Sequence, residues 1–121
     1  MKIKTSELTG TALDWAVARA FGHEVAFNSG SLVIIKRHDV VDYFDPSTNW
    51  GWGGPIIDSE LIALNVLKHQ PNLGLWMASS NGGYNTPSIP QYGPTPLIAA
   101  MRCLVASRFG DEVDVPEELL K

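Results

Sequence analysis

The fold is decided by residues 95–110, TPLIAAMRCLVASRFG. Thr95 suits the N-cap of a helix, Pro96 suits its first turn, and Gly110 suits the position after its end. Apolar residues recur along one face, and the opposite face carries small residues rather than charged ones: Ala99, Cys103 and Ala106. A helix with these two faces usually packs on both sides. We therefore expect residues 95–109 to form the central helix.

A second amphipathic helix is expected over residues 11–21. Its core-facing positions follow from the helical spacing of three apolar residues: Leu13, Val17 and Phe21. Thr11 and Asp14 are interpreted as a capping box at its start, and Gly22 as its end.

The strands are expected to be short. Residues 24–28 and 32–35 flank a turn at 28–31, and the second of them is apolar on both faces, which is typical of a strand in the middle of a sheet. Residues 75–78 suit another strand, and residues 113–116 suit an edge strand. The sequence therefore predicts an α+β fold, in which a small, mainly antiparallel sheet packs against a central C-terminal helix and an N-terminal helix.

Residues 42–55, DYFDPSTNWGWGGP, are the most unusual stretch. Their Pro, Gly and Asn content predicts irregular structure, yet they include four aromatic residues. Pro55 is interpreted as the first position of a helix. Residues 55–68 are ambiguous, because Asp58 and Glu60 after Pro55 favour a helix start, whereas residues 61–68 suit a helix or a strand. A short helix that runs into a strand satisfies both patterns. Residues 79–94 are predicted to be a long loop, which is often functional.

Composition limits the function classes. The 121 residues, 45% hydrophobic and 18% charged, predict one globular domain over residues 1–121. A net charge of -4 argues against general nucleic-acid binding, which depends on Lys and Arg. Neither a signal peptide nor a membrane span is evident, so we expect a cytoplasmic protein without membrane contact. A domain of this size can also gain stability as a homo-oligomer.

Signatures of enzymes and metal sites are mostly absent from the sequence. It contains no phosphate-loop motif, no His-Glu-x-x-His and no Gly-x-Ser-x-Gly. The three histidines, His23, His38 and His69, lack the spacing of metal ligands. Cys103 lies in mid-helix, away from the N-terminus that would lower its pKa. We expect no catalytic residue, no metal and no cofactor.

A nucleotide-binding pocket is a stronger functional hypothesis than a catalytic or metal site. Trp50 and Trp52 offer faces on which a base can stack, and Gly53 with Gly54 allows a ligand to approach the backbone. The helix expected from Pro55 offers N–H groups to a phosphate. The remaining ligand-binding positions are expected to be Tyr43, Asn49, Tyr84, Thr95 and Arg102. The same stretch also suits a packed turn over the core, which is the commoner role of such residues.

Three parts of the chain resemble the NinX family. They are residues 11–18 (TALDWAVA), residues 45–50 (DPSTNW) with 53–57 (GGPII), and residues 93–103 (GPTPLIAAMRC). This family comprises small proteins that lambdoid phages and their prophages encode among nonessential accessory genes. The resemblance implies a phage-derived protein that acts in the bacterial cytoplasm. It implies no activity and no catalytic residues.

Three function classes remain open. The first is a non-catalytic phage accessory protein that sequesters a small phosphorylated or nucleotide ligand, such as a host anti-phage immune signal; it predicts a pocket lined by Trp50, Gly54 and Arg102. The second is an effector that binds a host protein through the aromatic residues of 43–52, which predicts an exposed aromatic patch. The third, an enzyme, requires convergent ionisable groups in one cleft and is the least favoured.

Overall fold

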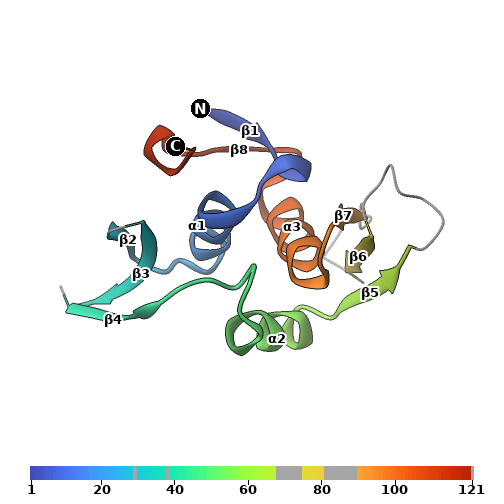
Figure 1. The fold of residues 1–121 in the computed structure, drawn as a ribbon, viewed down its shortest axis with the longest axis horizontal. Coiled ribbons are helices and arrows are strands. Elements are labelled where there is room, and N and C mark those ends of the chain that lie inside the picture. Colours follow the sequence, from blue (N-terminus) through green and yellow to red (C-terminus); the bar gives the residue numbers. More distant parts are fainter. Residues whose placement is uncertain (29, 38, 68–74, 81–89, 121) are drawn as a thin grey trace.

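The computed structural model describes residues 1–28, 30–37, 39–67, 75–80 and 90–120. Within these ranges, α3 (Pro96–Phe109) is the central element and contacts α1 (Gly10–Phe21), α2 (Trp50–Ser59) and strands on its other sides. Figure 1 shows α1 and α3 side by side in the middle of the molecule, with α2 beneath them. The predicted central position of the C-terminal helix is confirmed.

The start of α3 follows from its sequence. The Thr95 hydroxyl accepts a hydrogen bond from the Ile98 N–H at 3.1 Å, and Pro96 occupies the first helical position, where no N–H is needed. Its small residues allow close packing: a Cβ on Gly93 would lie 2.8 Å from the Ala99 nitrogen. The strand before α3 therefore lies against the helix backbone itself.

The N-terminal helix is also confirmed, but its predicted capping box is wrong. α1 begins at Gly10, and its N-cap Thr9 makes no side-chain capping bond. Thr11 thus lies inside the first turn, and Asp14 lies too far along the helix to reach back to the cap. Instead, the Asp14 carboxyl is buried and accepts a hydrogen bond from the Ser47 N–H. The helix ends as predicted at Gly22, whose φ of 72° is left-handed.

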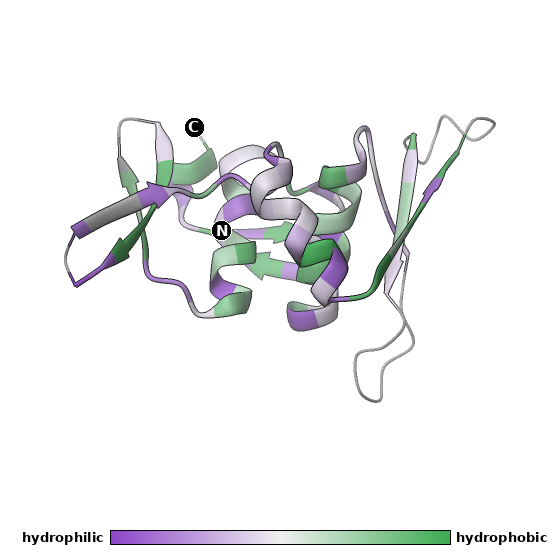
Figure 2. Cartoon of the chain, turned by 90° about the horizontal axis from the view of Figure 1, so that it is seen from below, coloured by the Kyte–Doolittle hydropathy of each residue, from purple (hydrophilic) through white to green (hydrophobic). Residues whose placement is uncertain are grey.

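In the described part of the chain the strands are antiparallel, as predicted, but they form three small sheets. Two of these sheets have three strands each and stand on opposite sides of the helices in Figures 1 and 2. The first contains, in spatial order, β2 (Val25–Asn28), β3 (Ser31–Lys36) and β4 (Asp39–Tyr43). The second contains β5 (Ile62–Val66), β6 (Trp76–Ser80) and β7 (Gln91–Gly93). Since α1 and α3 lie between the two groups, the strands do not join into one sheet.

The third sheet joins the two ends of the described chain. It pairs β1 (Lys2–Lys4) with β8 (Glu112–Asp114), and short 3-10 helices, η1 (Thr5–Glu7) and η3 (Glu117–Leu120), follow these strands. The predicted β2–β3 hairpin, the central place of β3 and the C-terminal edge strand are all confirmed.

Two predictions of irregular structure are wrong. Residues 50–59, expected to be irregular up to Pro55, form α2 with Pro55 inside it. Asn49 caps this helix and Ile56 is buried, so capping and packing outweigh the low helix propensity of Gly and Pro. The predicted 79–94 loop is shorter, because its ends pair in β6 and β7; residues 81–89 lie outside the described ranges. The expected helix that runs into a strand is confirmed by α2 and β5.

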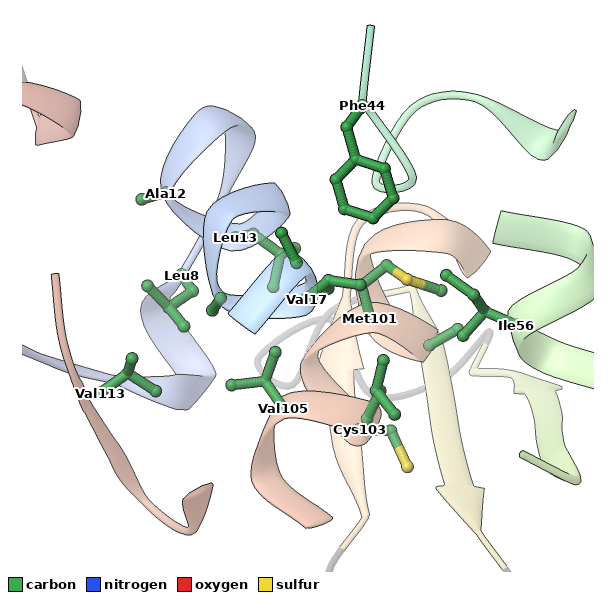
Figure 3. Packing of buried hydrophobic residues seen from close by; sticks show 14 of the residues in the cluster. Leu8, Ala12, Leu13, Val17, Phe44, Ile56, Met101, Cys103, Val105 and Val113 are labelled. Atoms are coloured by element: carbon green, nitrogen blue, oxygen red, sulfur yellow. The ribbon is translucent and has the colours of Figure 1, made fainter. Parts of the chain in front are cut away.

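The core gathers side chains from α1, α2 and α3 and from the segment before α2. Figure 3 shows the Phe44 ring pointing towards Met101 of α3, with Val17 of α1 and Ile56 of α2 on either side. The 44–49 segment therefore contributes to the core instead of crossing the surface.

Gly53 and Gly54 provide a matched test of this packing. A Cβ on Gly53 would clash with the Leu97 side chain and lie 2.8 Å from the Pro46 carbonyl oxygen, whereas a Cβ on Gly54 would meet nothing within 4 Å. We expect Gly53→Ala to lower the free energy of unfolding by about 1–3 kcal/mol. Gly54→Ala should raise it by up to about 1 kcal/mol. Urea denaturation of both variants checks this, and equal effects would contradict the packing described.

Candidate functional site

The four aromatic residues of the 42–55 stretch divide into two pairs. Phe44 is buried and meets the Trp52 ring edge-to-face, with ring centroids 5.1 Å apart. The Trp52 indole N–H also donates to the Tyr43 carbonyl at 2.8 Å. By contrast, the Tyr43 and Trp50 side chains are 63% and 54% exposed. The packed-turn interpretation therefore holds for one pair, and the other pair faces solvent.

The polar residues predicted beside them start helices. The Asn49 side-chain oxygen accepts from the Gly51 N–H at 2.8 Å, and its amide donates to Asp45 at 3.1 Å. Thr95 caps α3 in the same way. The first turns of α2 and α3 are therefore capped by their own chain, which leaves them less available to a phosphate.

The glycine pair lies in the second turn of α2. Because this helix begins at Trp50 and not at Pro55, Gly53 and Gly54 do not precede a helix N-terminus. The space that a side chain at Gly53 would need is occupied by the Leu97 side chain and the Pro46 carbonyl oxygen, whereas the space beside Gly54 is open.

Arg102 acts as a clamp within the fold. Its Nε donates to the Leu8 carbonyl and its Nη1 donates to the Tyr92 carbonyl, each at 2.7 Å. Burial lowers the pKa of the Arg102 guanidinium. This side chain joins α3 to Leu8 and to β7, and two of its donors bond those carbonyls.

One pocket formed by the described residues includes Tyr43 of the predicted ligand-binding set, but not Trp50, Gly54 or Arg102. A second pocket, between α1 and β8, contains none of the predicted ligand-binding residues. Tyr84 lies outside the described ranges. Ligand binding by these positions stays a prediction. Cys103 is buried, and burial raises the pKa of its thiol, as expected of a structural cysteine.

A pocket that the sequence did not reveal lies between α1 and the segment before α2. Its volume is about 450 Å³, and we call it the Asp14 pocket. It is lined by the start of α1, by residues 30–32 and by residues 43–45, 47 and 48. Its polar lining residues are Thr11, Asp14, Ser31, Asp45, Ser47 and Thr48.

Asp14 is the most perturbed group of this pocket. Its side chain is 5% exposed, and its carboxylate accepts a hydrogen bond from the Ser47 N–H at 2.8 Å. Burial raises the pKa of Asp14 to about 6, helped by the nearby Asp45 charge and opposed by hydrogen bonding from Ser47. The sequence feature that could have indicated this buried carboxyl is its place directly after the core residue Leu13. The capping-box interpretation instead gave Asp14 a role at the start of the helix.

Two further features of the described residues bear on function. The described residues contain no group of three His, Cys, Asp or Glu side chains that could hold a metal ion. None of the described helices has the length and apolar character needed to cross a membrane.

Comparison with known proteins extends the resemblance seen in the sequence. The family model described as "Bacteriophage P22, NinX" matches residues 4–108, which is most of the chain. No match was found among curated proteins.

The raised pKa of Asp14 predicts how stability depends on pH. The folded state binds this proton more tightly than the unfolded chain, in which the pKa is near 3.8. The contribution of protonated Asp14 to the free energy of unfolding is therefore fully present below about pH 4 and is lost as the pH rises through about 6. Relative to Asp14→Asn, the wild-type chain should lose up to about 3 kcal/mol of unfolding free energy across this window.

Urea denaturation at a series of pH values measures the difference. Asp58→Asn removes a carboxylate from the exposed side of α2 and is the matched control. Parallel pH profiles for the wild-type chain and Asp14→Asn would contradict the assignment.

Proposed function

The chain belongs to the bacteriophage P22 NinX family, and from this premise we propose that it is a non-catalytic phage accessory protein that binds a host protein. The contact is made by the aromatic surface, which we define as the side chains of Tyr43 and Trp50. One observation carries the proposal: these two rings are exposed although Phe44 and Trp52, from the same stretch, are packed. Action in the cytoplasm of the bacterial host is part of the proposal.

Both rings stand on ordered backbone. Tyr43 ends β4, and its carbonyl is held by the Trp52 indole. Trp50 opens α2 directly after its cap, Asn49. A side chain that is already positioned loses less conformational entropy on binding, so more of its contact energy contributes to affinity. Tyr and Trp are also the residues most often found to dominate binding energy at protein interfaces.

Sequestration of a phosphorylated ligand is less well supported by the geometry. Arg102 is the only cation among the predicted ligand-binding residues, and two backbone carbonyls already accept its hydrogen bonds. These contacts occupy two of the five guanidinium N–H donors, so a phosphate at Arg102 would be limited to the remaining donors or would have to displace the contacts.

The aromatic surface can be tested by capture from a bacterial host lysate with the tagged protein as bait. A host protein retained by the wild-type chain should bind the Tyr43→Ala/Trp50→Ala variant at least about tenfold more weakly, because truncation of a central interface aromatic costs about 2 kcal/mol or more. Calorimetry with that purified protein measures the difference. Thermal melting of the variant should be nearly unchanged, since both side chains are exposed.

Val66→Ala is the matched control. Val66 is also exposed, but it lies on β5, in the other three-stranded sheet. Equal capture of the host protein by the double variant and by Val66→Ala would refute the proposed surface.

A further inference from the structure

We propose that the Asp14 pocket binds the guanidinium group of an arginine side chain. This inference deepens the proposed function, and rests on it only for the idea that the arginine belongs to the host protein. Tyr43 lines the pocket and is also half of the aromatic surface, so one partner can contact both.

The pocket has a suitable size and charge. Its volume of about 450 Å³ lies within the range of about 300–1,000 Å³ that is typical of small-molecule sites. Asp14 and Asp45 both line it, and the described lining residues include no Lys, Arg or His. Two carboxylates without a cation favour a positively charged occupant and disfavour a phosphate, even beside the start of α1.

The Ser47 hydroxyl is buried in the same wall, beside Asp14. The Ser47 side chain is 2% exposed and lies near enough to Asp14 to lower the pKa of that carboxyl. Nevertheless, among the described residues its Oγ makes no hydrogen bond of normal geometry. A buried polar atom of this kind is costly unless something bonds to it. A guanidinium N–H can donate to the Ser47 oxygen while another donates to the Asp14 carboxylate.

The residue types that line the pocket favour arginine over a metal ion or a lysine. Among the described residues no third carboxylate, histidine or cysteine joins Asp14 and Asp45, so a divalent ion has few strong ligands. Guanidinium is planar, presents five donors and can stack on aromatic rings, which suits a pocket lined by carboxylates, hydroxyls and Tyr43. An ammonium group matches fewer of these features.

The test uses the isolated chain of residues 1–121, with N-acetyl-argininamide as the probe. Near neutral pH, NMR titration should shift the backbone amides of Thr11, Asp14, Ser31 and Ser47. Asp14→Asn keeps an acceptor for the Ser47 N–H but removes the charge, and should weaken binding roughly tenfold or more. Asp45→Asn provides a second variant, and Asp58→Asn is the control that should bind normally.

Binding should also weaken as the pH falls below about 6, where Asp14 becomes protonated. The charged group that faces Asp14 is Asp45; the β2–β3 turn contributes only uncharged residues to the described lining, such as Ser31 and Leu32. In Asp14→Asn this pH dependence should disappear.

Neutral N-acetyl-glutaminamide, inorganic phosphate and Mg²⁺ complete the panel. The inference is overturned if the argininamide shifts none of these amides, if Asp14→Asn binds it as well as the wild-type chain, or if phosphate or Mg²⁺ produces the shifts instead. Because no host protein is present, this outcome is independent of the capture experiment. If a variant that no longer binds the argininamide still captures the host protein, the proposed aromatic surface is retained and the arginine site is not part of that contact.

Discussion

The hydrogen bond from the Ser47 backbone to the Asp14 carboxylate ties the 44–49 segment to α1. With Ser47 held, Phe44 points into the core and the Pro46 carbonyl lies where Gly53 can approach it. Asn49 then begins α2, which carries Trp50 outward and Trp52 inward. Both the exposure of the aromatic surface and the shape of the Asp14 pocket therefore depend on how this short segment is held.

A carboxylate is a costly way to make that connection. Removing a charged carboxylate from water is unfavourable unless it is well paired, and the raised pKa of Asp14 is the direct consequence. An asparagine would accept the same hydrogen bond without this cost. What the carboxylate adds is negative charge at the wall of a pocket that also contains Asp45 and the Ser47 hydroxyl, whose oxygen makes no hydrogen bond of normal geometry within the described residues. The guanidinium proposed for this pocket would compensate each of these features.

Sequence patterns predicted the elements that local residues determine. Thr95, Pro96 and Gly110 bound α3, and its small-residue face correctly indicated packing on both sides. The irregular structure expected for residues 50–55 failed because local propensity disfavours Gly and Pro in a helix, whereas burial of Ile56 and the fit of Gly53 against Leu97 favour it. The roles of Arg102 and Asp14 depend on partners distant in sequence: Leu8 is 94 positions from Arg102, and Ser47 is 33 positions from Asp14. Nothing in the local sequence marks such partners.

Hydrogen–deuterium exchange on the complex with a captured host protein tests the central claim most directly. If the partner covers the aromatic surface and the Asp14 pocket, amide exchange should slow in residues 10–14 and 43–52, and should stay unchanged in β5 and β6. Protection confined to β5 and β6, with residues 43–52 exchanging as in the free protein, would contradict the account.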